Sequence, residues 1–178
     1  MEENKSSLWK NALNWGVIMG IVLIIYSLLM FFLDLSLEQW VGWVSYVFMV
    51  GILILATINY RDKAMGGSIS YGQALGFGVV VILFASIINA IYFYIFVKYI
   101  DPEFINKMLA MGEEKMIEQG IPEEQIEMGI EMQKKFMKPI VMCLISIPTT
   151  VFMGLIFSLI TSIFLKKTKP EIQFNEES

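Results

Sequence analysis

The sequence predicts an all-α integral membrane protein, a four-helix bundle with an extracytoplasmic helical hairpin between its third and fourth spans. Of its 178 residues, 56% are hydrophobic, and only 13 Lys and Arg and 17 Asp and Glu are charged. None of these charges falls in residues 11–33, 39–60, 64–97 or 139–165. A helix needs roughly 20 apolar residues to cross a bilayer core about 30 Å thick, and each window is long enough. A water-soluble domain would instead alternate polar and apolar positions.

The first two spans are predicted over about residues 12–33 and 40–60. Residues 34–38 between them contain no Lys or Arg and are too few to reach a distant helix, so they predict a tight antiparallel turn. The first apolar window is longer than the roughly 7–15 residues of a signal-peptide core. We therefore interpret it as a retained span.

The third span is predicted over about residues 71–97, with helix continuing to about Ile100. Ser70 is followed three residues later by Gln73, just before an apolar run. This is the pattern of a capping box, in which the Ser hydroxyl and the Gln amide bond to each other's backbone N–H groups. A helix from Ser70 to Ile100 would exceed the hydrocarbon thickness, so we expect it to tilt or protrude.

The segment from about 101 to 138 is predicted to form a helical hairpin outside the bilayer. Asp101-Pro102-Glu103 is typical of a helix start, with Asp as the cap and Pro at the first helical position, so a helix is predicted from Pro102 to Gln119. Gly120 would end this helix and Pro122 would begin the next. Apolar residues recur at helical spacing in both halves, which indicates that the two helices pack together.

The fourth span is predicted over about residues 139–165. Pro148 lies inside it and is expected to bend the helix, because proline removes one backbone hydrogen bond. The polar tail, residues 168–178, is predicted to be disordered. Residues 1–178 are thus interpreted as a single membrane domain.

The distribution of basic residues predicts the orientation. Four spans place both termini on one side of the membrane. Seven basic residues lie there and in the loop between the second and third spans, namely Lys5, Lys10, Arg61, Lys63, Lys166, Lys167 and Lys169. The hairpin has six, diluted by nine acidic residues. The positive-inside rule therefore favours an orientation with both termini cytoplasmic.

The composition removes several classes of function. The chain has no histidine and a single cysteine, Cys143, so it cannot build His-based acid–base catalysis or an internal disulfide. A net charge of −4 without a basic stripe argues against nucleic-acid binding. We predict no enzyme activity, no catalytic residues and no cofactor or metal, and we interpret Cys143 as a small hydrophobic residue.

The methionines raise a copper(I) alternative, because thioethers are soft ligands. The residues that could contribute at helical spacing are Met108 with Met111, Met128 with Met132, and Met137 with Met142 and Cys143. Methionine is also an adaptable apolar filler, and no histidine or second cysteine supports a site. We therefore favour packing as their role.

Small residues form ridges on two of the spans. Ala12, Gly16 and Gly20 line one face of the first, and Gly72, Ala74, Gly76 and Gly78 lie along the third. Such ridges allow helices in lipid to approach closely. We expect packing within the chain, with packing between chains as the alternative.

Two functional hypotheses remain. The first is a non-enzymatic protein whose hairpin docks a partner or supports a homo-oligomer. The second is a small-solute or ion pathway through the bundle, lined by Asn89, Thr149, Thr150 and the helix break at Pro148. The spans contain no Asp, Glu, Lys, Arg or His, which argues against ion-coupled transport.

Parts of the chain resemble a known family. Tyr60-Arg61, the run from Gly66-Gly67 through Ser70-Tyr-Gly-Gln-Ala-Leu75, and Tyr99-Ile-Asp-Pro-Glu-Phe104 are similar to the small bacterial membrane proteins grouped as domain of unknown function 4199. The resemblance covers nearly the whole chain. It implies a multi-pass inner-membrane protein and brings no activity, cofactor or catalytic residue.

Overall fold

The structure, a computed structural model, describes residues 2–167. Every secondary-structure element named in these residues is a helix. In chain order they are α1 (Glu2–Phe32), α2 (Gln39–Lys63), α3 (Tyr71–Ile95), the π-helical turn η1 (Phe96–Ile100), α4 (Phe104–Glu118), α5 (Glu123–Phe136) and α6 (Pro139–Leu165). The predicted disordered tail, 168–178, lies outside the described residues.

Four helices are long and apolar enough to span a membrane. They are Ser7–Phe32 within α1, α2 itself, α3 together with η1, and α6. The predicted all-α class with four spans is therefore confirmed. Pro148 does not interrupt α6, which is one helix from Pro139 to Leu165.

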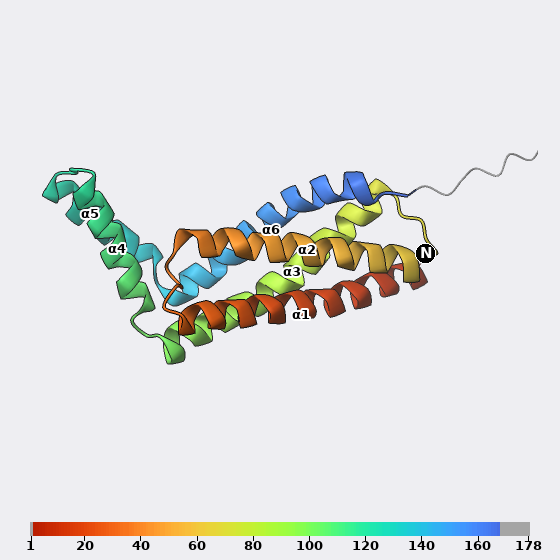
Figure 1. Cartoon of the computed structure of the whole chain (residues 1–178), viewed down its shortest axis with the longest axis horizontal. Helices are drawn as coiled ribbons and strands as arrows, with labels where there is room; N and C mark the ends of the chain where they lie inside the picture. The colour runs from red at the N-terminus through yellow and green to blue at the C-terminus, as the bar shows by residue number, and fades with distance from the viewer. Residues whose placement is uncertain (1, 168–178) are drawn as a thin grey trace, which may run out of the picture.

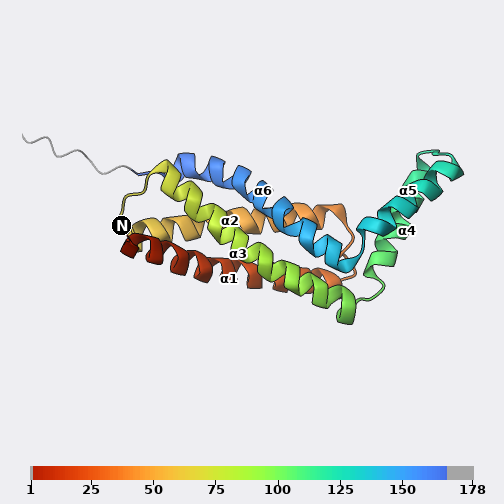
Figure 2. The same ribbon diagram turned by 180° about the vertical axis from the view of Figure 1, so that it is seen from behind.

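α3 is the central helix of the bundle. It packs against α1 on one side and α6 on another, and α2 contacts all three (Figure 1). The four helices lie side by side in the opposite view as well, and α1 begins at the end where α6 stops (Figure 2). The apolar window of α3 is 44% buried, whereas the other three reach only 11–22%. Their remaining apolar surface is what a lipid-facing helix presents.

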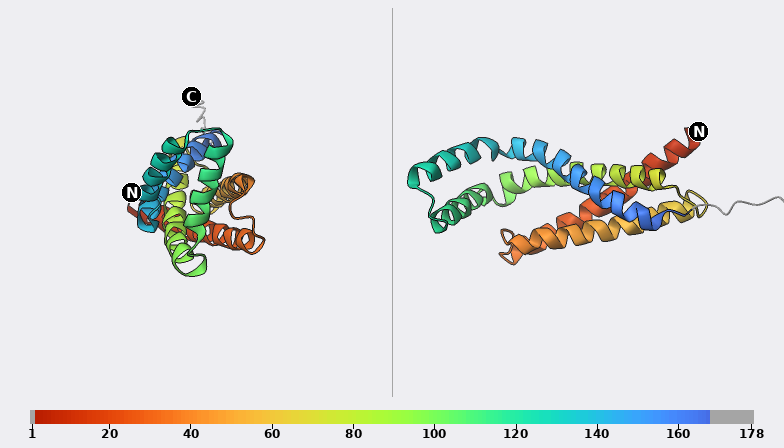
Figure 3. Two further views of the ribbon diagram at one scale, coloured as in Figure 1. Left: turned by 90° about the vertical axis from the view of Figure 1, so that its left-hand side faces the viewer. Right: turned by 90° about the horizontal axis from the view of Figure 1, so that it is seen from above.

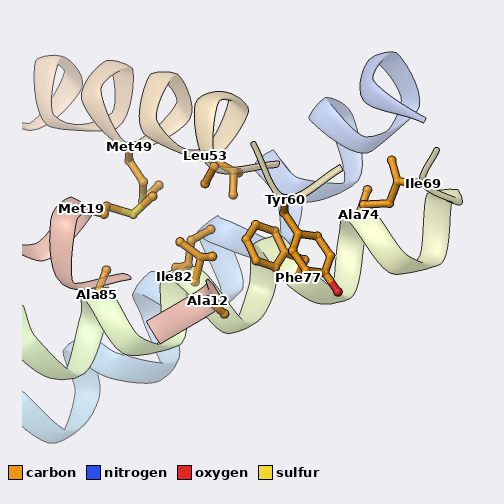
Figure 4. Packing of buried hydrophobic residues seen from close by; sticks show 12 residues of the cluster. Ala12, Met19, Met49, Leu53, Tyr60, Ile69, Ala74, Phe77, Ile82 and Ala85 are labelled. Atoms are coloured by element: carbon orange, nitrogen blue, oxygen red, sulfur yellow. The ribbon is translucent and has the colours of Figure 1, made fainter. Parts of the chain in front are cut away.

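The half of the bundle that holds the start of α1 and the end of α6 is closely packed. Ala12, Leu53, Ala56 and Phe77 have no exposed surface. The rings of Tyr60 and Phe77 stack at 4.2 Å between centroids, which joins the end of α2 to the start of α3 (Figure 4). This dense packing closes the bundle at that end.

The ridge on α1 packs within the chain, as expected. A Cβ atom added to Gly16 would lie 2.5 Å from the Cβ of Phe84 and 2.9 Å from the backbone oxygen of Val81. A Cβ on Gly20 would lie 2.9 Å from a methyl group of Ile88. Only glycine lets the backbones of α1 and α3 come this close.

The ridge expected on α3 is only partly used. Gly72 and Gly76 face open space, so the expectation that they pack within the chain is wrong, and the alternative of packing between chains stays a prediction. Gly78 lies against Ser158 of α6, and the Ser158 hydroxyl donates a 3.1 Å hydrogen bond to the Leu75 carbonyl. Ala74, between the two exposed glycines, is buried in the core, so only one side of the first turns of α3 packs against the bundle.

The start of α3 has the predicted capping box. The Ser70 hydroxyl accepts a 3.3 Å bond from the Gln73 N–H, and the Gln73 side-chain oxygen accepts a 3.0 Å bond from the Ser70 N–H. Immediately before it, Ile69 and Lys167 exchange two backbone hydrogen bonds of 2.9 Å. The entrance to α3 is thereby tied to the end of α6.

The connection from α3 to α4 differs from the prediction. The helix begins at Phe104 rather than at Pro102, and Asp101 does not cap it. The Asp101 carboxylate instead forms a 3.0 Å ion pair with the Lys107 ammonium group. Because Asp101 is only 8% exposed, this pairing offsets the cost of removing its charge from water.

α4 and α5 pack against each other and extend beyond the ends of α1 and α2 (Figures 1 and 3). Leu109 and Ile126 are the buried residues of this pair. The Met116 side chain lies against Gly129, where a Cβ would meet it at 3.2 Å. We refer to α4 and α5 together as the hairpin.

Candidate functional site

A cavity of about 420 Å³ lies inside the half of the bundle nearest the hairpin. Its walls are the second half of α1, the first half of α2 and the second half of α3, with Thr150 from α6 and Phe104 from α4. Most of the lining is apolar or aromatic. Its volume falls within the range of roughly 300–1,000 Å³ that is typical of small-molecule sites.

A second cavity of about 340 Å³ adjoins the first between α3 and α6. Both are partly open rather than enclosed. The residues that line both are Ser27, Ser86, Asn89, Tyr92, Phe93 and Thr150. Five of these six carry a hydroxyl or amide group, so the polar side chains gather where the two cavities meet.

Two of these polar side chains form hydrogen bonds to backbone carbonyls within α3. The Ser86 hydroxyl donates to the Leu83 carbonyl at 2.8 Å, and the Asn89 amide donates to the Ala85 carbonyl at 2.9 Å. An asparagine amide has two hydrogens and an acceptor oxygen. The bond to Ala85 uses one hydrogen, and the rest of the Asn89 amide retains its capacity to bind a ligand.

A third cavity, about 210 Å³, lies at the base of the hairpin and shares Ser36 and Phe104 with the first. Asp34, Asp101 and Lys107 also line it. Among the described residues, the Ser36 hydroxyl is the one buried side-chain polar atom without a hydrogen-bond partner. A buried polar atom left unpaired costs roughly 1–3 kcal/mol.

Aromatic side chains close the main cavity at this end. The Phe104 ring packs edge-on against Phe96 at 5.4 Å and against Phe93 at 6.2 Å, and Phe31 packs edge-on against Phe96 at 5.2 Å. Phe96 opens the π-helical turn η1, and such turns are frequent at functional sites. The hairpin therefore begins at the wall of the cavity.

The structure brings together only part of the residue set that was hypothesised to line a pathway. Asn89 and Thr150 both line the cavities. Thr149 is exposed on α6, where its hydroxyl donates to the Ile145 carbonyl at 2.8 Å, and Pro148 is exposed as well. One turn of α6 therefore carries one residue toward the cavity and its neighbours away from it.

The methionine set of the copper alternative is distributed over several surfaces. Met128 and Met132 are exposed on α5, and Met108 is half-buried on α4. The Cys143 thiol is buried and donates to the Ala90 carbonyl at 3.3 Å, which joins α6 to α3. In the part of the chain that the structure describes, no three His, Cys, Asp or Glu side chains gather as metal ligands.

Sequence reasoning did not single out several of the cavity residues. Ser27, Ser36, Tyr92 and Phe104 meet there although they come from separate segments. The Tyr92 hydroxyl lies 3.4 Å from the Ser27 hydroxyl, which links α3 to α1. The available signal was that Ser27 and Tyr92 are polar groups inside apolar windows, but their sequence separation concealed their proximity.

The four apolar spans around a partly polar cavity define a multi-pass α-helical membrane protein. A family described as "Protein of unknown function (DUF4199)" matches residues 14–167. The chain belongs to this family, as its resemblance predicted. No curated protein and no solved structure matches the chain.

Proposed function

We propose that this is a non-enzymatic protein of the bacterial inner membrane, with both termini cytoplasmic, whose extracytoplasmic hairpin docks a partner protein. The observation that carries the proposal is an exposed apolar stripe on α5 beside a strongly acidic hairpin tip. The partner segment would present an apolar face and basic side chains.

The apolar stripe consists of Met128, Met132 and Phe136. These residues follow one another at intervals of four, so they lie on one face of α5. They are 62%, 63% and 58% exposed, although the helix beneath them packs against α4 through Ile126. Outside the bilayer no lipid covers such a stripe, and contiguous exposed apolar surface of this kind is typical of interaction sites.

The hairpin tip supplies the charge. Between residues 113 and 127 there are six Glu and one Lys, a net charge of −5, and all seven side chains are exposed. The base of α5 has the opposite sign, with Lys134 and Lys135 in its last turn and Lys138 after it. A complementary partner is basic opposite the tip.

The same charge order disfavours pairing with a second copy. Two copies in one membrane share their orientation, so a two-fold axis along the membrane normal would place tip beside tip and base beside base. Glu123 and Glu124 would then face their own equivalents, as would Lys134 and Lys135. Like charges in such positions weaken association, which favours a different protein as the occupant.

Two features support a role without catalysis. The cavity lining contains no histidine, cysteine or carboxylate, and a nucleophile needs an adjacent base to be activated. The Ser86 hydroxyl donates to a backbone carbonyl of its own helix. The cavity is therefore suited to binding.

In-cell photo-crosslinking tests the docking proposal. A photoreactive amino acid at Met132 is expected to capture one defined partner, whereas the same group at Lys134, on another face of α5, captures little of it. Neutralising the tip with Glu123→Gln, Glu124→Gln and Glu127→Gln is expected to lower the yield at Met132, since the partner is basic there. Yield is measured by immunoblot and identity by mass spectrometry.

Two results would contradict the proposal. A captured species that consists of a second copy of the chain would assign the stripe to a homo-oligomer. The crosslinking yield at Met132 could equal the yield at Lys134, or it could be unchanged by the three neutralising substitutions. Either result would show that the captured protein meets the hairpin by random collision and not at a specific docking surface.

A further inference from the structure

We propose that the cavities around Asn89 bind an uncharged amphiphile from the membrane, an apolar chain that carries a hydroxyl or carbonyl group. The inference concerns a site separate from the apolar stripe of the hairpin and does not depend on the docking proposal.

The shape and chemistry of the cavity wall indicate the class of ligand. Met19, Leu23, Met30, Met49 and Ile82 provide an apolar surface along the main cavity. Methionine and leucine side chains adapt to an irregular apolar body. An apolar chain would therefore fill most of the 420 Å³.

The polar group of the ligand has defined partners. Asn89 lies where the two cavities meet and retains one amide hydrogen and its carbonyl oxygen. Ser36 lies toward the hairpin, and its buried hydroxyl has no partner within the described residues. A hydroxyl or carbonyl group in the cavity can bond to Asn89 directly. It can bond to Ser36 once that side chain turns toward the cavity, which would remove the cost of an unpaired buried hydroxyl.

The ligand is uncharged because the main cavity offers no counter-charge. None of its lining residues is Asp, Glu, Lys, Arg or His. A charge in such an environment would lose its hydration without compensation. The Asp101–Lys107 pair lies in the third cavity, and its two charges already neutralise each other.

The cavity is a binding site rather than a channel because one end of the bundle is closed. Toward the start of α1 and the end of α6, Leu53, Phe77 and Val81 have no exposed surface, and Tyr60 stacks on Phe77 (Figure 4). Toward the hairpin, Phe104 covers the cavity. The second cavity is partly open between α3 and α6, which gives a molecule in the bilayer lateral access.

Photoaffinity labelling of the full-length protein in lipid vesicles tests the inference. The probe is a monoacylglycerol with a diazirine in its acyl chain. We expect saturable labelling of peptides that contain residues 82–93 or 142–150, displaced by excess unlabelled monoacylglycerol. A diazirine hydrocarbon without a polar group and a diazirine fatty acid with an ionised carboxylate are expected to label these peptides less.

Variants and matched controls separate the cavity from the lipid-facing surface. Asn89→Leu is expected to lower monoacylglycerol labelling about three- to tenfold, the range for one lost hydrogen bond. Ser45→Trp, which fills the cavity from α2, is expected to lower it as well. Asn14→Leu and Thr149→Val change exposed residues of α1 and α6 and should leave labelling unchanged.

Labelling that does not saturate, or that stays the same in both Asn89→Leu and Ser45→Trp, would overturn the inference. Equal labelling of the cavity peptides by the hydrocarbon probe would do so too, because it would remove the role of the polar group. If Asn89→Leu does not fold, as judged by thermal unfolding, the Ser45→Trp result decides.

Discussion

At the scale of single residues, the packing of the helices depends on which glycine positions leave no room for a Cβ methyl group. Gly16 and Gly76 look alike in the sequence, since both are glycines within apolar helices. In the structure Gly16 lies against the backbone of α3, whereas Gly76 faces open space. The same substitution should therefore have different effects at the two positions.

We predict that Gly16→Ala destabilises the protein by roughly 1–3 kcal/mol, the cost of overpacking a tight interface. Its Cβ would meet the Val81 backbone oxygen, which cannot move away as a side chain can. Gly76→Ala is the matched control and should leave stability unchanged or slightly higher, because alanine favours the helix. Thermal unfolding in detergent measures both, and equal shifts would contradict the assigned contact.

At the scale of the elements, the sequence predicts helix starts well where the signal is local. The Ser70 capping box forms as predicted because both partners lie within one turn. At Asp101 the same reasoning was wrong, because the ammonium group of Lys107, six residues further along the chain, competes for the carboxylate. Local cap patterns are reliable only when no nearby charge offers a stronger partner.

The Asp101–Lys107 pair gives a prediction for the base of the hairpin. Lys107→Met removes the partner of a buried carboxylate and should loosen the first turn of α4 by about 1 kcal/mol, a value kept small because Lys107 is half-exposed. Hydrogen–deuterium exchange of residues 101–108 is expected to accelerate. Lys107→Arg should restore protection, and Lys115→Met, at the far end of α4, should not affect it. Unchanged exchange in Lys107→Met would show that the pair contributes little.

At the scale of the whole molecule, the two ends of the bundle differ. The end that holds the start of α1 and the end of α6 is closely packed and tied by the Ile69–Lys167 backbone pair, whereas the hairpin end contains the cavities. In the proposed orientation the closed end faces the cytoplasm. The hollow half and the hairpin then belong to the outer half of the membrane and the space beyond it.

Cysteine accessibility tests this orientation, because the single natural cysteine is buried. We predict that Gln119→Cys, in the hairpin, reacts with a membrane-impermeant maleimide on intact spheroplasts. Lys63→Cys, at the end of α2, should react only after lysis, since the proposed orientation places it on the cytoplasmic side. The labelled fraction is measured by gel shift with unmodified protein as the background control. The reverse pattern would place the termini outside.

The sequence by itself determined the all-α class of this protein and the positions of its four long apolar helices. The fourth span was predicted over residues 139–165, which are the bounds of α6. The prediction succeeds because charged side chains are excluded from lipid, so the uncharged window in the sequence marks the helix directly. The first helix extends well before residue 12, because a helix that leaves the hydrocarbon can continue through charged residues.

Only the tertiary structure decided which residues form the cavity. Thr149 and Thr150 are adjacent, yet one is exposed and the other lines the cavity, because the direction of a side chain depends on how α6 is rotated against α3. In lipid, both faces of a helix can be apolar, so hydropathy does not reveal that rotation. Packing contacts such as those of Gly16 and Gly78 fix it, and they exist only once the helices have met.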